Sequence, residues 1–369
     1  MNIKSITCHD VYNYGASLQA YALMKYLSDL GHDVEIIDYK PDYLSYNLWA
    51  IGERWNKNVF LRVLFFMYVV PQRLIQAKRR RNFDRFTKEY LRITSQRYSN
   101  NEELKKDIPM AEAYFAGSDQ IWNTDSKNGR DPAFYLDFAP KNAIVASYAA
   151  SFSTSQINPG YINFVVEKLK KFDFISVRES TGLKILQSLG IENGVHVLDP
   201  VFLLKKEQWS ELATTKSKDK YVLVYDQENN ASIKSAALYL AKKRNLKIYA
   251  FKGLYPKRYA DRKVVDSGPK EFLELIRNCE VLLTNSFHGT AFSILFEKEF
   301  YVFKREHEKV NSRMVDLLNM FDLNDRLVDK EKVFTESEEI DYGKLLTKIN
   351  NVRRTSYDYI QTVLTNRGK

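Results

Sequence analysis

The sequence predicts an α/β protein built from two Rossmann-like lobes, whose parallel sheets face a shared cleft. The chain has 369 residues, 44% of them hydrophobic and 28% charged, and this length suits two domains better than one small core. Short apolar runs alternate with amphipathic helical patterns along most of it, which is typical of parallel sheets covered by helices. Such sheets bind ligands beyond the carboxyl ends of their strands.

The first lobe is predicted to span residues 1–202 and to begin with a strand–helix–strand unit. Its first strand runs from Ile3 to Thr7, a helix follows from about Leu18 to Leu27, and Val34 begins the second strand. Later strands are expected at about 114–117, 143–149, 174–180 and 196–202, with a helix over 181–189. Gly15 stands alone rather than in a G-x-G-x-x-G fingerprint, so its turn is either a plain tight turn or a loop approaching a substrate.

A basic, aromatic insert at about residues 41–97 is expected to be helical. Residues 55–97 carry eleven Lys or Arg against two acidic residues, which is nearly all of the net charge of +10. Residues 59–70 are mostly apolar, but they are fewer than the roughly 20 needed to cross a bilayer. This stretch either lies in an anionic membrane interface beside Lys78–Arg81 or packs on its own domain. No recognition motif accompanies the charge, so no nucleic-acid partner is expected.

Residues 203–219 are polar, lysine-rich and without periodicity, and are predicted to connect the lobes. The second lobe, residues 220–335, has expected strands at 221–225, 246–250, 281–283 and 300–303, and helices near 231–243, 269–278, 290–296 and 310–320. The last segment, 336–369, holds a helix at about 342–365. No strand follows that helix, so it is expected to pack back on the first lobe.

Cysteine usage and the N-terminus predict a cytoplasmic protein. Cys8 and Cys279 are the two cysteines and lack metal-ligand spacing, which favours a reducing compartment and no metal site. The chain starts directly with a strand pattern and shows no signal-peptide layout.

The stretch Val281–Phe292 has the pattern of a buried strand, a polar turn and the first turn of a helix. Such a joint gathers free backbone N–H groups and the positive end of a helix dipole, which attract anions. His288 lies inside this joint, with Ser286 and Thr290 as further donors. The alternative is that this is an ordinary α/β joint with a structural histidine.

Polar residues stand at five predicted strand ends: Asn13 and Tyr14, Ser118 and Asp119, Arg178 and Glu179, Asp199, and Asn285–His288. Arg178 can grip a carboxylate or phosphate with its planar fork, or form a salt bridge with a neighbour. Asp119 and Asp199 can act as general bases, or as a helix cap and a turn residue. Lys304, Arg305, Lys309 and Arg313 follow the last strand and add positive charge. The pattern predicts a cationic cleft for a small anion, without a metal.

Five segments resemble the polysaccharide pyruvyl transferase family: Asn13–Ala20, Gly117–Asn123, Ser176–Glu179, Asp199–Phe202 and Asn285–Thr290. They occur in the family's order, and the resemblance runs from residue 1 to about residue 320. It implies two Rossmann-like lobes of the GT-B type. It also implies transfer of the enolpyruvyl group of phosphoenolpyruvate to sugar hydroxyls, giving a pyruvate ketal and phosphate, with phosphoenolpyruvate as co-substrate and no cofactor.

By the same resemblance, Arg178 and His288 match positions that hold the donor, and Asp119 matches a position in the same cleft. Better-known members carry an arginine two residues before the histidine, where this chain has Ser286, so Lys304, Arg305 or Arg313 would supply that charge. The expected catalytic residues are therefore His288, Asp119 and Asp199. The expected donor-binding residues are Arg178, His288, Ser286, Arg305 and Arg313, and the expected acceptor-binding residues are Asn13, Tyr14 and Ser118.

The resulting hypothesis is a cytoplasmic transferase, peripheral to the inner face of the membrane. Its acceptor would be a sugar or lipid-linked glycan in capsule or exopolysaccharide synthesis. One alternative is a GT-B glycosyltransferase that uses a nucleotide sugar, for which Glu306 and Glu308 are the available ribose-binding carboxylates. Another is a non-catalytic assembly subunit at the membrane, which would not need the pair Arg178 and His288.

Overall fold

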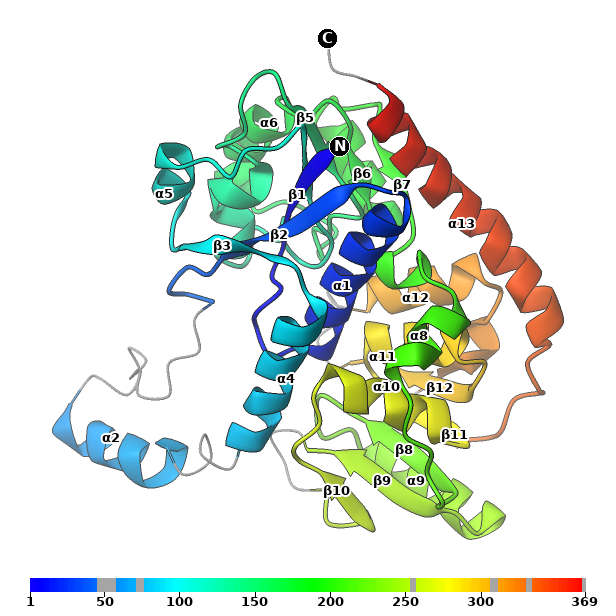
Figure 1. Ribbon diagram of the computed structural model, residues 1–369. Coiled ribbons are helices and arrows are strands. Elements are labelled where there is room, and N and C mark those ends of the chain that lie inside the picture. Colours follow the sequence, from blue (N-terminus) through cyan, green and yellow to red (C-terminus); the bar gives the residue numbers. More distant parts are fainter. Residues whose placement is uncertain (45–57, 71–75, 253–256, 306–310, 330–333, 367–369) are drawn as a thin grey trace.

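Two parallel sheets form the centres of two lobes in the computed structural model (Figure 1). The structure describes residues 1–44, 58–70, 76–252, 257–305, 311–329 and 334–366. The first sheet has the order β3-β2-β1-β4-β5 and the second the order β10-β9-β8-β11-β12-β13. The predicted fold class, an α/β protein with two Rossmann-like lobes, is confirmed.

The N-terminal lobe contains the first sheet: β1 (Asn2–Ile6), β2 (Asp33–Tyr39), β3 (Ile93–Tyr98), β4 (Ala113–Ala116) and β5 (Ile144–Ser147). A small parallel pair, β6 (Ser176–Val177) and β7 (Val195–His196), adjoins β5. Its helices are α1 (Tyr14–Asp29), α2 (Val59–Leu64), η1 (Phe65–Val69), α4 (Ala77–Tyr90), α5 (Asn101–Lys106), α6 (Ile162–Leu169) and α7 (Ser180–Ser188). Short 3₁₀ turns are η2 (Asn128–Arg130), η3 (Pro132–Tyr135), η4 (Pro159–Tyr161) and η5 (Pro200–Phe202).

The C-terminal lobe contains β8 (Tyr221–Tyr225), β9 (Lys247–Phe251), β10 (Arg262–Val264), β11 (Val281–Thr284), β12 (Glu299–Phe303) and β13 (Leu327–Val328). Its helices are α9 (Ala231–Arg244), α10 (Pro269–Asn278), α11 (Phe287–Leu295) and α12 (Ser312–Met320), with the 3₁₀ turn η7 (Asn324–Arg326). Central strand β11 is buried along its whole length, as its continuous apolar run requires of a strand covered on both faces.

Three expectations about single elements were wrong. The connection 203–219 contains helix α8 (Lys206–Leu212), whose Trp209 is fully buried and anchors an otherwise polar segment. The insert ends in a strand, β3, which is polar because it lies at the sheet edge. The strand expected at 196–202 is real only at His196, the end of β7, and its last three residues form the 3₁₀ turn η5, because Asp199 caps that turn and Pro200 opens it. Parts of the insert, 45–57 and 71–75, lie outside the described residues.

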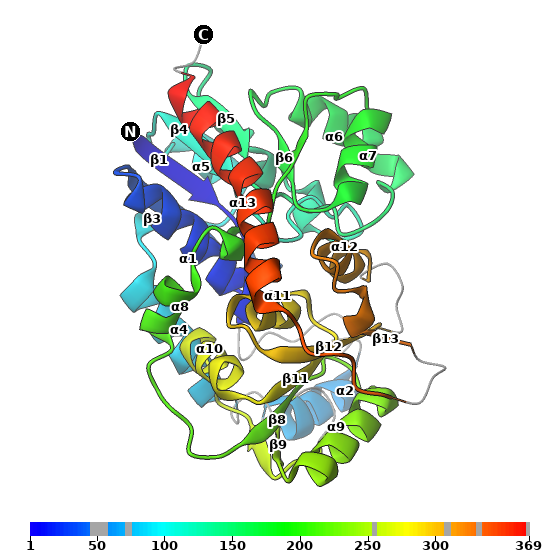
Figure 2. The ribbon, with the colours of Figure 1, turned by 90° about the vertical axis from the view of Figure 1, so that its right-hand side faces the viewer.

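The lobes are joined by shared packing and by the last helix, α13 (Tyr342–Thr365). Across the boundary, the Tyr14 ring of α1 stacks on Phe272 of α10, with centroids 4.5 Å apart. Helix α13 runs from the C-terminal lobe up along the N-terminal lobe (Figure 2), where the Tyr359 hydroxyl donates to the carbonyl of Ser147 at 2.7 Å. Among the described residues, no helix combines the length and apolar character needed to cross a membrane.

Candidate active site

A cavity of about 100 Å³ lies between the lobes, at the carboxyl ends of both sheets. That volume holds several water molecules or one small ligand, since a single water needs about 10–15 Å³ on the same scale. The N-terminal lobe contributes residues that follow β1 and β4, and the C-terminal lobe residues that follow β8, β11 and β12. The lining is Asn13, Gly15, Asp119, Gln120, Tyr225, Gln227, Asn285, Ser286, Phe287, His288, Arg305, Arg313 and Met314.

Two helix N-termini, one from each lobe, point at this cavity. The Asn13 side chain caps α1 by accepting from the backbone N–H of Ala16 at 3.2 Å. The Ser286 hydroxyl caps α11 by accepting from the N–H of Gly289 at 3.4 Å. Both helix dipoles therefore place their positive ends at the same cavity, which favours an anion there.

The two helix ends touch at Gly15 and His288. A Cβ atom built on Gly15 would lie only 1.9 Å from Nδ1 of the His288 ring, so no other amino acid fits without moving that ring. The sequence left open a plain tight turn or a loop approaching a substrate. The structure shows a third reason for the glycine, which makes room for a histidine from the opposite lobe.

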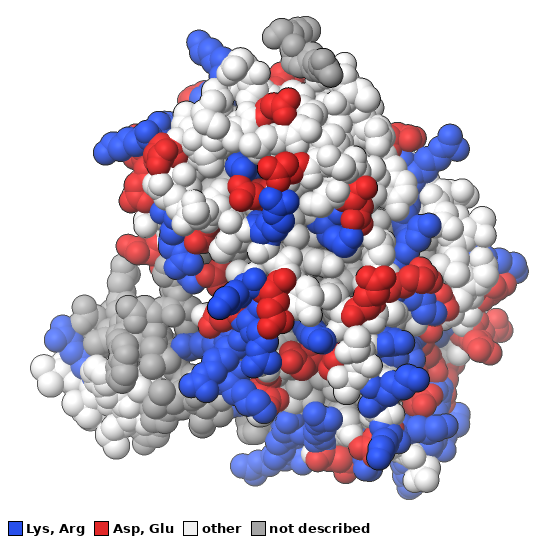
Figure 3. Space-filling model, in the orientation of Figure 1, with Lys and Arg blue, Asp and Glu red and all other residues white. Residues whose placement is uncertain are grey.

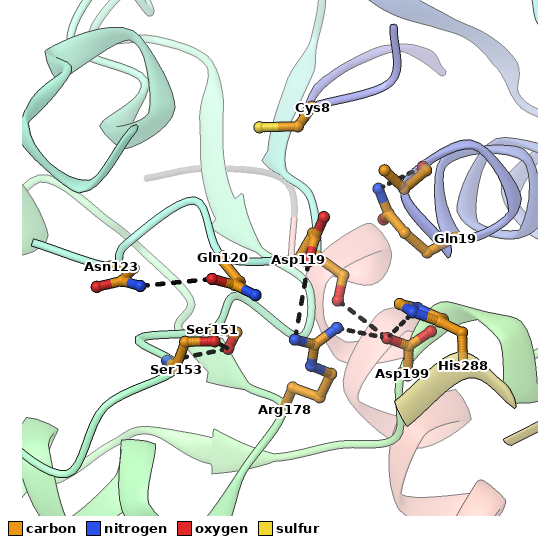
Figure 4. Close-up of polar contacts among 12 residues, drawn as sticks. Cys8, Gln19, Asp119, Gln120, Asn123, Ser151, Ser153, Arg178, Asp199 and His288 are labelled. Carbon is orange, nitrogen blue, oxygen red and sulfur yellow. Dashed lines mark hydrogen bonds and ion pairs between the residues drawn. The ribbon is translucent and has the colours of Figure 1, made fainter. Parts of the chain in front are cut away.

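Behind the cavity, Asp199 joins Arg178 and His288 (Figure 4). Its Oδ2 accepts from Arg178 Nη1 at 2.8 Å and lies 3.5 Å from His288 Nε2. Its Oδ1 accepts from the N–H of Val201 at 3.1 Å. Burial alone would raise the pKa of Asp199, but His288 and Arg178 outweigh burial and hold that pKa well below its usual range. Asp199 is thus an ionised carboxylate fixed between Arg178 and His288.

Arg178 does not line the cavity. Its side chain is 1% exposed, and the guanidinium carbon lies 4.8 Å from the centre of the Phe287 ring. Asp119 at 4.0 Å and Glu179 at 3.9 Å also surround the guanidinium. Burial would lower the pKa of Arg178, but Asp199, Glu179 and Asp119 raise it. The sequence left a donor grip and a salt bridge open, and the geometry shows the salt bridge.

Arg313 and Arg305 supply the positive charge on the cavity wall. Arg313 is 8% exposed, and no carboxylate in the described chain lies within ion-pair distance of it. Its Nε is buried and has no hydrogen-bond partner in the part of the chain that the structure describes. Burial and the nearby Arg178 lower the pKa of Arg313 to about 10. Arg305 is held by Glu228, to which its Nε donates at 3.2 Å. Buried polar groups normally have partners, so Arg313 is equipped to meet an anionic ligand.

The other expected site residues divide into two groups. Asn13, Asp119 and Ser286 lie on the cavity wall with His288, and Asp119 has φ of 75°, a left-handed conformation that is rare without glycine. Tyr14 and Ser118 are not among the residues that line this cavity, and their expected contact with the acceptor stays a prediction. The Tyr14 hydroxyl is 2.6 Å from the Ser267 hydroxyl, and Ser118 is fully buried with its hydroxyl toward Asp199.

Sequence reasoning missed several residues on the cavity wall. Gln120 follows Asp119 directly, and Tyr225 and Gln227 lie at the carboxyl end of β8. The rule of polar residues at strand ends would have found Gln227, because β8 itself was predicted. Lys304 is exposed and does not line the cavity. Lys309, Glu306 and Glu308 lie outside the described residues.

Comparison with known proteins gives a family and a fold. A sequence model described as polysaccharide pyruvyl transferase matches residues 13–307. No curated protein sequence matches the chain. The UDP-GlcNAc 2-epimerase of Methanocaldococcus jannaschii is 12% identical with a TM-score of 0.51, covering 99% of each chain. The UDP-N-acetylglucosamine 2-epimerase of Rickettsia bellii is 11% identical with a TM-score of 0.52, covering 100% of this chain and 97% of its own. At such identities the likeness shows the fold alone, a GT-B arrangement of two lobes.

Proposed function

Because this chain belongs to the polysaccharide pyruvyl transferase family, we propose that it moves the enolpyruvyl group of phosphoenolpyruvate onto sugar hydroxyls of a glycan. The products are a pyruvate ketal and phosphate, made for a capsule or exopolysaccharide at the inner face of the membrane. The observation that carries the proposal is the cavity wall itself. There, His288, the buried Arg313 and two helix N-termini converge on a space the size of a small anion, and Arg313 Nε has no hydrogen-bond partner among the described residues.

Phosphoenolpyruvate carries a carboxylate and a phosphate, and the wall offers a partner for each. Arg313 has a planar fork of donors that suits bidentate binding of either group. The backbone N–H groups at the N-terminus of α11 bind the second of these two groups, and Arg305 lies on the same cavity wall. Ser286, which stands where better-known relatives have arginine, caps this helix, and Arg313 takes over the missing charge.

The proposed reaction begins with a proton from His288 to the methylene carbon of phosphoenolpyruvate, which leaves positive charge on the adjacent carbon. A sugar hydroxyl attacks that carbon and gives its proton to Asp119, the one acidic residue on the described cavity wall. Phosphate then leaves, and a second hydroxyl closes the ketal ring as its proton is released. One general acid and one general base suffice for these steps.

Asp199 acts in this scheme as a positioning residue, not as the base that the sequence analysis considered. It is buried, stays ionised and lies 3.5 Å from His288 Nε2, so it fixes the ring and stabilises the charged imidazole. Arg178 in turn fixes Asp199 through the 2.8 Å ion pair. In this scheme Arg178 does not bind the donor directly but acts on it through Asp199 and His288.

The test is pyruvate transfer from phosphoenolpyruvate to a panel of lipid-linked and synthetic glycans, read by mass spectrometry. His288→Ala is expected to lose at least the 10²-fold typical of general acid–base catalysis while keeping its melting temperature. The matched control is His32→Ala. His32 directly precedes β2, so it lies at the amino ends of the strands, whereas the cavity lies at their carboxyl ends. Near-normal transfer by a folded His288→Ala protein would refute the proposed mechanism.

A further inference from the structure

Helix α2 and the following turn η1 expose large apolar side chains. Val59 is 74% exposed, Phe60 69%, Val63 49% and Met67 62%. Phe60, Val63 and Met67 recur every three or four residues, so they share one face of the helix. Helix α2 and η1 extend away from the body of the protein (Figure 1). Exposed apolar patches of this kind mark sites of interaction with a partner or a membrane.

Helix α4 carries a row of basic side chains. Lys78, Arg81, Arg85 and Lys88 are exposed and follow each other at intervals of three or four residues, so they form one stripe. Phe83 and Phe86 are buried on the other side of the helix. Within the described chain, Arg81, Arg85 and Lys88 have no carboxylate at ion-pair distance, whereas Lys78 meets Asp266. Basic side chains gather over this part of the surface in Figure 3.

The two remaining arginines of the basic run turn inward. Arg79 Nη2 donates to the carbonyl of Tyr12 at 2.7 Å, and its guanidinium lies 4.7 Å from the centre of the Phe83 ring. Arg80 lies over the ring of Tyr12 at 5.8 Å. These two hold α4 against the body, so on α4 the basic side chains without an ion pair to a described residue are Arg81, Arg85 and Lys88.

We propose that the apolar face of α2–η1 and the basic stripe of α4 together dock this protein on an anionic lipid bilayer. An amphipathic surface helix buries its apolar side chains at the boundary of headgroups and acyl chains. Cations beside it attract anionic headgroups. A second copy of the chain fits less well, because its basic stripe would repel this one.

The insert begins at the end of the first sheet that faces the active-site cavity. The insert leaves the N-terminal lobe at the carboxyl end of β2. Asn13 and Asp119 reach the cavity from the carboxyl ends of β1 and β4 in the same sheet. On the proposed function, this is the end at which a membrane-bound glycan would be presented. The docking itself does not depend on that function, and it is tested without turnover.

The experiment is co-sedimentation of the full chain with phosphatidylcholine vesicles, with and without phosphatidylglycerol. Wild type is expected to bind the anionic vesicles, and to bind them less when salt shortens the screening length from about 10 Å at 0.1 M to about 3 Å at 1 M. Each basic residue near such a surface contributes about 1 kcal/mol, or about five-fold in binding. The variant Arg81→Ser, Arg85→Ser, Lys88→Ser is therefore expected to bind at least ten-fold more weakly.

A control removes the same charge elsewhere. Lys216, Lys218 and Lys220 are exposed and lie just before β8, at the amino ends of the strands and away from the cavity. Changing all three to Ser should therefore leave vesicle binding almost unchanged. Equal losses in the two triple variants would overturn the docking surface, since net charge alone would then explain binding. The proposal would also be overturned if the wild-type protein did not co-sediment with anionic vesicles.

The apolar face has its own test. Phe60→Ser with Met67→Ser is expected to weaken vesicle binding at high salt, where the apolar contribution dominates. The control, Met110→Ser with Leu238→Ser, changes two other exposed apolar side chains. If Phe60→Ser with Met67→Ser instead turns a dimer into a monomer, measured by light scattering, and leaves vesicle binding intact, the face belongs to a second copy and the proposal is wrong.

Discussion

Gly15 lies in the first turn of α1 with no room for a side chain, because the His288 ring occupies the space beside its Cα atom. The backbone of Gly15 therefore limits how far the ring can move toward α1. The catalytic histidine of the proposed mechanism is thus positioned from both sides, by Asp199 at Nε2 and by Gly15 near Nδ1.

Gly15→Ala is expected to lose about 10²-fold in turnover, the cost of moving a catalytic group by about 1 Å. Its melting temperature should change less, because the overpacking cost of about 1–3 kcal/mol is offset in part by the better helix propensity of alanine. Transfer kinetics and thermal unfolding measure the two effects. The control is Gly160→Ala, where the nearest atom to a new Cβ is 3.6 Å away. Unchanged turnover in Gly15→Ala would show that the ring tolerates displacement.

Arg313→Met is expected to weaken phosphoenolpyruvate binding by about 1.5–3 kcal/mol, the value of a charge-assisted hydrogen bond. The same change should stabilise the ligand-free protein. Because burial and Arg178 lower the pKa of Arg313 to about 10, from a reference value of 12.5, the charged guanidinium destabilises the fold at every pH below about 10. This cost shrinks only as pH rises from about 10 to 12.5.

Calorimetric titration and thermal unfolding at neutral pH separate the two effects of Arg313→Met. Lys304→Met is the control, since Lys304 is exposed at the end of β12 and does not line the cavity. The assignment fails if Arg313→Met binds phosphoenolpyruvate as wild type does.

The sequence predicted several cavity residues at the ends of correctly placed strands. His288, Ser286 and Asn13 follow strands with clear apolar patterns, and all three lie on the cavity wall. Arg178 and Asp199 also stand near strand ends, yet they face each other behind that wall. Alternation of residue types cannot tell these cases apart, because whether a side chain faces a cavity or a neighbour depends on packing between distant segments.

Among the elements, α13 is one whose range could be predicted completely from the sequence. Its buried residues recur at helical spacing from Leu345 to Leu364, so the predicted range of about 342–365 matches the structure. Strands β10 and β13 were not predicted, because three and two residues are too few for a periodic signal. What the pattern of α13 could not give is its partners: Arg353 Nε donates to the carbonyl of Phe202 at 2.6 Å, and Tyr359 donates to that of Ser147.

Ile360→Ala tests how much α13 stabilises the protein. Ile360 is fully buried, and such truncations cost about 2–5 kcal/mol because they leave a cavity. Urea unfolding should show a lower midpoint with an unchanged slope. Leu346→Ala on the same helix removes a similar side chain that is 38% exposed, so it should change the free energy of unfolding by much less. Equal effects of the two changes would mean that the packing of α13 adds little to stability.

At the scale of the whole molecule, one hydrophobic core runs through both lobes. It includes Leu18 of α1, Phe272 of α10, Phe292 of α11 and Ile360 of α13. The predicted architecture of two lobes was correct. A shared core could not be predicted, because apolar periodicity shows which face of an element is buried but not which element covers it.

That continuity couples the unfolding of the two lobes. Each lobe also has a core of its own, but the shared core is lost when either lobe unfolds, so heat or denaturant should melt both lobes in one transition. The cavity between the lobes then exists only in molecules that are folded throughout. Any distant substitution that lowers global stability also lowers the fraction of molecules able to bind the donor, even when it leaves every cavity residue in place.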